Sequence, residues 1–466
     1  MVTHDNDAEM AELGPKSIFI VGGVVKEVIT TLEPQAVREH LSSLLQVKNL
    51  VVLLGSGASF HLGSPQTRNL TNRQVLALIK ESGGEPTDAD EALLTTINPS
   101  DNGDLEQLLN GLQLASSLAA QAGQDAVTLG SGSATKSYPN DQVGGLRQRI
   151  NRALAEACRL PKAGKSLAPP FDTDPLLAHR TFLSRILRGR RSNLPRPRVF
   201  TTNYDLVIER ALDELGYPYI DGFSGTVDRR LNLAFYGLDF HRVEMTTQSV
   251  LARAEGALYL HKVHGSLNWR SCTNRDRLTG LESLEVKQSD APAEADDLVL
   301  IYPTSAKEGD TLAYPYSDLL RLLGDAVQQE DTAVIVAGYG FADAHINRLL
   351  LRSLATNAAL NVFVADPVAV LSHADMTAVT TDAQQRPLGD IDVTPKRTSI
   401  ATLATANDSR IAVLTGDLGK FSELAKLIPG VAAPGEAPTA VASLLPYWPR
   451  SPISWPVRAC HLGLHR

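Results

Sequence analysis

Short runs of hydrophobic residues alternate along this chain with amphipathic stretches of helical period. The run Leu50 to Leu54 is hydrophobic at every position, which is typical of a strand buried on both faces of a parallel sheet. Comparable runs predict further strands at Arg198 to Thr202, Leu258 to Val263, Leu298 to Ile301, Ala333 to Ala337, Asn361 to Ala365 and Ile411 to Leu414. Strands that alternate with helices predict an α/β fold, a Rossmann-like parallel sheet flanked by helices.

Helical periodicity follows or precedes several of these strands. The stretch Leu32 to Gln46 has Pro34 near its start and places its leucines on one face. Further helices are predicted at Leu206 to Leu215, Asp343 to Leu354 and Lys420 to Leu427.

The pattern divides the chain into an N-terminal segment with a helix (1–47), a main α/β domain (48–428) and a proline-rich tail (429–466). Within the domain, residues from about 75 to 196 form a helical insertion subdomain, because an ordinary βα connection spans only about 2 to 6 residues besides its helix. The stretch Gln121 to Asn140, rich in Gly, Ser, Ala and Gln, is predicted to be a loop inside that insertion.

Composition excludes several classes of protein. The 466 residues carry a net charge of −8, so bulk charge predicts no direct binding of nucleic acid. No run approaches the ~20 hydrophobic residues of a membrane span, and the N-terminus lacks a secretory pattern, so we expect a cytoplasmic protein with no membrane contact. The three cysteines lie far apart and form no CxxC pair, which argues against a disulfide framework and a zinc ribbon.

A local basic cluster stands out against this acidic background. Two interpretations remain open: a solvated helix end and loop, or a patch for phosphates or an acidic partner. The cluster consists of Arg185, Arg188, Arg190, Arg191, Arg196 and Arg198.

Glycine-rich segments follow two of the predicted strands. Gly55-Ser56-Gly57-Ala58-Ser59 directly follows the first buried strand, where glycines let the backbone approach a diphosphate closely. The usual third glycine of a dinucleotide fingerprint is missing, so a tight turn that needs small residues is the alternative. Gly338-Tyr339-Gly340-Phe341 follows a later strand and leads into a helix.

Polar residues that could take part in catalysis or ligand binding follow the other strands. Thr201-Thr202-Asn203-Tyr204-Asp205 offers an amide and a carboxylate, although Asp205 is equally suited to capping the next helix. His264-Gly265 offers a group that titrates near neutral pH, although a lone histidine is more often structural. His261 and His264 are expected on opposite faces, which argues against a two-histidine metal site.

Asp366 is placed to bond a ribose diol or to act as a turn residue before Pro367. In an open α/β sheet these motifs converge on one edge.

The ordered set of motifs resembles sirtuins, which carry a glycine-rich loop with serine, then T-x-N-x-D, then His-Gly, then a second glycine loop. The departures are informative: the two cysteine pairs of the sirtuin deacylases are missing, and a large helical insertion is present. In both respects the chain resembles the zinc-free bacterial sirtuin-like NAD hydrolases of antiphage defence, such as Thoeris and related effectors. Tyr302-Pro303-Thr304 with Lys307 is similar to a stretch in that subgroup.

The resemblance implies an NAD+ glycohydrolase that gives nicotinamide and ADP-ribose and uses no metal. His264 would be the general base toward water or a ribose hydroxyl, Asn203 would hold the ribose and orient the water, and Asp205 would hold the nicotinamide carboxamide. The amides around Gly55, Ser56 and Gly57 would bind the diphosphate, and an acidic Asp366 would disfavour NADP. The residues expected to bind NAD+ are Gly55, Ser56, Gly57, Ser59, Thr202, Gly338, Gly340 and Asp366.

Three alternatives remain. The same bond cleavage serves a protein deacylase or ADP-ribosyltransferase, and a non-catalytic subunit would bind NAD or ADP-ribose without turnover. A hydride-transferring oxidoreductase shares the first loop but leaves the Asn-x-Asp and His-Gly segments unexplained. An effector that empties the NAD pool must be restrained, so we expect a homo-oligomer and a regulatory partner, such as a hexameric DNA-translocating ATPase or a phage component.

Overall fold

The computed structural model describes residues 17–29, 34–65, 70–101, 105–130, 135–161, 167–244, 250–275, 282–288, 298–300, 314–341, 343–367, 403 and 406–430. No helix within these ranges is long and apolar enough to cross a bilayer.

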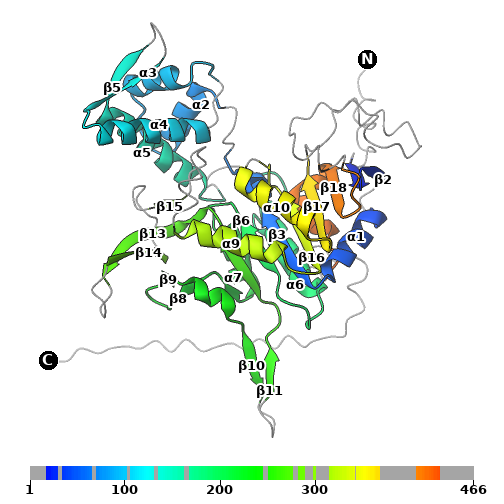
Figure 1. Ribbon diagram of the computed structural model, residues 1–466. Helices are drawn as coiled ribbons and strands as arrows, with labels where there is room; N and C mark the ends of the chain where they lie inside the picture. Colours follow the sequence, from blue (N-terminus) through cyan, green and yellow to red (C-terminus); the bar gives the residue numbers. More distant parts are fainter. Residues whose placement is uncertain are drawn as a thin grey trace, which may run out of the picture.

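A nine-stranded sheet forms the centre of the molecule, in the order β2-β1-β18-β17-β16-β3-β6-β12-β7 (Figure 1). All strands from β18 to β7 are parallel, and the β1–β2 hairpin adds two antiparallel strands at the β18 edge. The predicted Rossmann-like α/β fold is confirmed. The strands are β1 (Ser17–Val21), β2 (Val24–Ile29), β3 (Asn49–Leu54), β6 (Arg198–Thr201), β7 (Tyr219–Ile220), β12 (Leu258–Lys262), β16 (Thr332–Ala337), β17 (Leu360–Asp366) and β18 (Ile411–Gly416).

Helices cover both faces of this sheet. In β3, Val51 and Leu53 pack on the side of α9 (Tyr316–Val327) and α10 (Ala344–Thr356). The alternate residues of β3 pack on the opposite side, together with the buried faces of α1 (Gln35–Leu45), α6 (Leu177–Gly189), α7 (Val207–Leu215) and α13 (Phe421–Leu427). Each large hydrophobic side chain buried in these layers contributes about 1.5 to 3 kcal/mol by leaving water. This double coverage explains why β3 is hydrophobic at consecutive positions.

A separate lobe projects from one end of the sheet (Figure 1). It contains α2 (Asn72–Glu81), α3 (Asp88–Ile97), α4 (Leu105–Gln121), α5 (Asn140–Ala157) and a hairpin of β4 (Ala126–Leu129) and β5 (Lys136–Pro139). The lobe has a hydrophobic core of its own, and threonine capping boxes start α2 and α3. The loop predicted for Gln121 to Asn140 is wrong, because this stretch contains the β4–β5 hairpin.

The helix α6 was expected inside the helical insertion, but it packs on the main sheet. Arg185 of α6 donates to the backbone oxygens of Lys426 and Ile428, at 2.9 Å for the latter, and thereby ties α6 to α13. The hydrophobic residues of α6 belong to the core cluster of the sheet. The lobe with its own core therefore ends before α6.

A second, antiparallel sheet has strands from both before and after β12, in the order β15-β13-β14-β9-β8. The prediction that Leu298 to Ile301 joins the parallel sheet is wrong, because β15 pairs antiparallel with β13. The strands are β8 (Phe223–Ser224), β9 (Arg230–Leu231), β13 (Gly265–Arg275), β14 (Glu282–Gln288) and β15 (Leu298–Leu300). A further hairpin, β10 (His241–Glu244) with β11 (Val250–Arg253), projects on the side away from the helical lobe (Figure 1).

Candidate functional site

One row of residues, paired in register, crosses the parallel strands β17, β16, β3, β6 and β12. It consists of Ala365, Ala337, Leu54, Thr201 and Lys262. The sequence motifs lie one or two positions beyond this row on each strand. They therefore meet at the carboxyl edge of the sheet, as predicted. The chain order reverses between β3 and β16, which is where ligands bind in sheets of this kind.

The two glycine-rich loops pack backbone against backbone at this reversal. The Gly55 amide donates to the Ala337 oxygen at 3.2 Å, and the Gly57 amide donates to the Gly338 oxygen at 2.9 Å. A Cβ at Gly55 would lie 2.6 Å from the Gly338 oxygen, so only glycine allows this approach. The two amides are thus already bonded, and their expected contact with a diphosphate gains no support from this conformation.

Substitution of Gly338 by alanine is expected to destabilise the protein. Gly338 has φ +63°, and a Cβ there would lie 2.1 Å from the Ala58 nitrogen. The left-handed backbone costs alanine about 1 to 2 kcal/mol, and the clash adds about 1 to 3 kcal/mol of overpacking. Urea unfolding measures the sum.

Gly216 supplies the matched control for this substitution. It has φ +67° at the end of α7, but nothing lies within 4 Å of the position of its Cβ. Gly216→Ala should therefore show the backbone cost alone. Equal losses of stability in the two variants would contradict the close packing of the two loops.

Asn203 lies two residues beyond the paired position of β6 and is buried, with 7% of its surface exposed. Its backbone amide donates to the Thr201 hydroxyl at 3.0 Å, and its Nδ2 donates to the Ser59 hydroxyl at 3.3 Å. Its Oδ1 has no hydrogen-bond partner among the described residues. Because an unpaired buried acceptor is costly, this oxygen is suited to accept a hydrogen bond from a ligand hydroxyl or a water.

His264 lies two residues beyond the paired position of β12, the strand next to β6, and is also buried. Its Nε2 lies 3.0 Å from Oδ2 of Asp343, at ion-pair distance but without a hydrogen bond in this conformation. The other carboxylate oxygen of Asp343 accepts from the amides of His345 and Ile346 and caps α10. The cap fixes the carboxylate, so Asp343 is placed to stabilise an imidazolium at His264.

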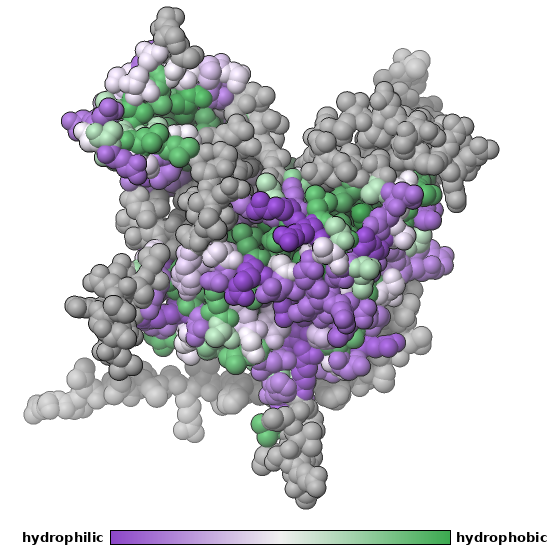
Figure 2. Space-filling model, viewed as in Figure 1, coloured by the Kyte–Doolittle hydropathy of each residue, from purple (hydrophilic) through white to green (hydrophobic). Residues whose placement is uncertain are grey.

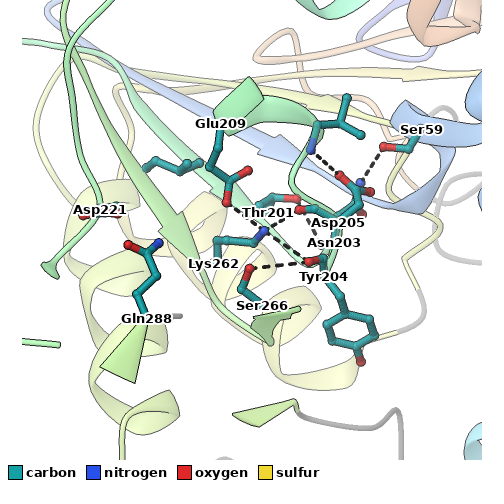
Figure 3. Close-up of polar contacts among 12 residues, drawn as sticks. Ser59, Thr201, Asn203, Tyr204, Asp205, Glu209, Asp221, Lys262, Ser266 and Gln288 are labelled. Carbon is teal, nitrogen blue, oxygen red and sulfur yellow. Dashed lines mark hydrogen bonds and ion pairs between the residues drawn. The ribbon is translucent and has the colours of Figure 1, made fainter. Parts of the chain in front are cut away.

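Asp205 sits in a buried polar network beneath this edge (Figure 3). Its Oδ1 accepts from the amide of Val207, the first residue of α7, at 3.1 Å, although the N-cap position itself is Leu206. Lys262 Nζ donates to the backbone oxygens of Asp205 and Tyr204 and to Glu209 Oε1, at 2.9 Å for the last. Burial raises the pKa of Asp205 and of Glu209, and the charge of Lys262 opposes both shifts. Contact of Asp205 with a carboxamide stays a prediction.

The other predicted binding residues differ in how accessible they are. Ser56 is exposed at the start of a 3-10 helix (Ser56–Leu62), and Thr202 and Gly340 are half-buried. Ser59 is fully buried beside Asn203. Asp366 is 1% exposed at the end of β17, where the short turn Asp417–Gly419 packs on its backbone.

The helical lobe packs against two half-buried side chains from the segments that carry the candidate site. Tyr204 and Leu267 pack against the hydrophobic core of the lobe. The Leu267 amide donates to the Tyr204 oxygen at 3.0 Å, which joins the segments after β6 and β12. The lobe therefore contacts the two segments that carry Asn203 and His264.

The described residues contain no group of three or more histidine, cysteine or acidic side chains arranged to hold a metal ion. Neither Cys158 nor Cys272 forms a disulfide among the described residues, and Cys460 lies outside them. Tyr302, Pro303, Thr304 and Lys307 also lie outside them.

Two contacts of this site were missed by sequence reasoning. Asp343 was assigned only to a helix start, and nothing in the sequence separates a capping aspartate from one that also faces a histidine. Lys262 was included in a hydrophobic strand, where a lone lysine signals a buried ion pair. Its partner Glu209 comes from the helix that follows a different strand, so the pairing depends on strand order.

Comparison with known proteins finds one family model that is similar to part of this chain. Residues 197–387, which include Asn203, His264, Gly338 and Asp366, match the SIR2-like domain. No curated protein sequence matches the chain significantly.

Three solved structures show distant similarity to the chain. One, described as a Sir2 homologue–NAD complex, is 14% identical, with 84% of this chain and 91% of that chain covered and a TM-score of 0.31. A Sir2 homologue variant in complex with ADP-ribose is 14% identical, with coverages of 84% and 98% and a TM-score of 0.28. A third, from work on the mechanism and regulation of Sir2 enzymes, is 13% identical, with coverages of 80% and 97% and a TM-score of 0.29. Similarity at this level supports no inference about activity.

Proposed function

We propose that this chain, which carries a SIR2-like domain over residues 197–387, hydrolyses NAD+ to nicotinamide and ADP-ribose at the carboxyl edge of its central sheet. One observation carries the proposal. Asn203 Oδ1 is buried and has no hydrogen-bond partner among the described residues, and His264, which is buried two residues beyond the paired position of the neighbouring strand, has its Nε2 3.0 Å from the Asp343 carboxylate. An acceptor and a base in this arrangement suit a ribose hydroxyl and an attacking water.

The reaction places modest demands on the site. The nicotinamide nitrogen of NAD+ is already positively charged, so its departure needs no general acid. Water forms the new bond to the ribose C1′ while the bond from C1′ to the nicotinamide nitrogen breaks, and the bonding electron pair stays with nicotinamide. The proton of the water passes to His264, where Asp343 stabilises the resulting charge. Asn203 holds the ribose and orients the water.

Incubation of the purified full chain with NAD+ tests the proposal. We expect nicotinamide and ADP-ribose in equal amounts, measured by liquid chromatography. The product also separates this reaction from the related ones: a deacylase yields O-acyl-ADP-ribose only with an acyl-peptide, and an ADP-ribosyltransferase yields modified protein. A chain that binds NAD+ without releasing nicotinamide, alone or with its partner, would contradict hydrolysis and support a binding subunit.

We further propose that this activity depletes cellular NAD in antiphage defence, under the control of an oligomeric state and a regulatory partner. The helical lobe supports a regulated enzyme, because it packs on the segments that carry Asn203 and His264 through Tyr204 and Leu267. Its helix α4 exposes Leu114 and Leu118, one turn apart, at 47% and 65% of their surface. Figure 2 shows hydrophobic colour gathered on this lobe, whereas the face over α9 and α10 is largely hydrophilic. We therefore place the partner contact on the lobe.

A further inference from the structure

Four of the six arginines of the basic cluster line one cavity in the structure. Two members of the cluster lie elsewhere. Arg185 binds the backbone at the end of α13, and the Arg198 guanidinium carbon lies 5.8 Å from the centroid of the Tyr259 ring. The remaining four line a cavity of about 540 Å³, where Arg253 from the end of β11 joins them. These four are Arg188, Arg190, Arg191 and Arg196.

The cavity lies at the opposite edge of the sheet from the candidate active site. Pro197 and Ala257 in its lining directly precede β6 and β12, whereas Asn203 and His264 lie two residues after the ends of the same two strands. The cavity is therefore separate from the edge where we propose NAD+ cleavage.

Positive charge dominates this cavity. Among the described residues of its lining, Glu255 is the one carboxylate, and Asp239 bridges Arg196 and Arg253 from beside the cavity, at 3.0 Å from Arg253 Nε. Five guanidinium groups thus face two carboxylates. This excess is local, because the whole chain carries a net charge of −8.

Protein contacts hold three of the arginines in place before any ligand arrives. Arg190 donates to four backbone oxygens, among them those of Leu45 and Pro195, at 2.7 and 3.2 Å. Arg253 also donates to the Leu194 oxygen at 2.6 Å, and Arg196 to that of Ala254 at 2.8 Å. Side chains fixed in this way lose little conformational entropy when a ligand binds.

The charge on Arg190 is poorly compensated. All of its hydrogen bonds go to backbone oxygens. Burial, and then repulsion by Arg253, lower its pKa to about 10. An anion between these two guanidinium groups would relieve both effects.

We propose that this cavity binds a small ligand that carries two or more phosphate groups. Guanidinium groups match phosphate oxygens in pairs of parallel hydrogen bonds, which favours phosphate over other anions. The volume is that of a small-molecule site. Tyr217, which accepts from Arg188 Nε at 2.7 Å, and Leu187 give part of the lining a flat and hydrophobic character. Inorganic polyphosphate and the phosphate chain of a nucleotide share the chemistry that this cavity recognises.

Isothermal titration calorimetry of the full chain with inorganic tripolyphosphate tests this site, with ADP as a second arm. The variant Arg188→Gln/Arg191→Gln removes two exposed charges, neither bonded to a backbone oxygen in the described structure, so the fold should persist. In this variant we expect the dissociation constant for tripolyphosphate to be at least about tenfold higher than in the wild type. Each hydrogen bond between charged groups contributes about tenfold to the affinity.

A matched variant controls for net charge. Arg73→Gln/Lys80→Gln removes the same charge from the exposed surface of α2 in the helical lobe and should leave tripolyphosphate binding unchanged. Tighter binding of ADP that is lost in Arg188→Gln/Arg191→Gln would identify a nucleotide, and equal binding would identify the phosphate chain alone. No binding of tripolyphosphate by the wild type, or equal weakening in both double variants, would overturn the proposal.

Discussion

Replacement of His264 by alanine is expected to lower the rate of nicotinamide release from NAD+ by about 10² to 10⁴-fold, which is the usual contribution of a general base. The imidazole follows the strand next to that of Asn203 at the carboxyl edge, and its Nε2 lies 3.0 Å from the carboxylate of Asp343. Nicotinamide release at saturating NAD+ measures the effect. Thermal unfolding of the variant should show that the fold persists.

Two further variants make this test specific. His241→Ala changes an exposed histidine on β10, in the hairpin that projects away from the helical lobe, and should retain full activity. Asp343→Asn removes the charge that faces His264 but keeps a side chain able to cap α10, so activity should fall by less than in His264→Ala. Full activity of His264→Ala would refute the assigned base, while loss of activity in His241→Ala as well would indicate a general defect.

Replacement of Lys262 by methionine is expected to destabilise the protein by about 3 to 5 kcal/mol, because removing one partner of a buried ion pair leaves the other charge unpaired. Lys262 and Glu209 have side chains that are 4% and 12% exposed, and they lie 2.9 Å apart. The variant also deprives the backbone oxygens of Asp205 and Tyr204 of a donor. Urea unfolding measures the loss.

An exposed pair provides the control for this loss. Lys420 lies 2.7 Å from Asp417, with both side chains more than half exposed, so Lys420→Met should cost no more than about 1 kcal/mol. Adding Glu209→Gln to Lys262→Met should recover part of the stability, since the unpaired charge is then gone. Equal losses of unfolding free energy in Lys262→Met and Lys420→Met would show that the buried pair adds nothing to stability beyond what an exposed pair adds.

The pH dependence of the Lys262→Met deficit follows from Glu209. Burial raises its pKa in the folded protein above the ordinary 4.5, and Lys262 normally opposes that rise. Without Lys262 the folded pKa rises further, so ionised Glu209 destabilises the variant at neutral pH. Below the unfolded pKa, Glu209 is protonated in both states and its penalty disappears. The difference in unfolding free energy between wild type and variant should therefore shrink as the pH falls from neutral toward about 4.5 and change no further through Glu209 below that pH.

Much of the central sheet could be predicted, because double-sided burial leaves a local signature. Continuous hydrophobic runs marked β3, β16 and β18 to within two residues at each end, and helical periodicity marked α1 and α10. The N-terminal hairpin was missed because β1 is stabilised by pairing with β18, nearly the whole chain away. Local patterns carry no information about such pairing.

The sequence by itself determined which residues stand at strand ends, and hence that Asn203, His264 and the glycine loops share one edge. That inference holds because parallel strands all end on the same side, whatever their order. Only the tertiary structure decided which side chains meet there: Asp343 with His264, and Lys262 with Glu209. It also decided that the Gly55 and Gly57 amides bond to the backbone of Ala337 and Gly338 and that four arginines of the cluster line one cavity with Arg253. These contacts depend on strand order and side-chain direction, which are set by packing between segments distant in the chain.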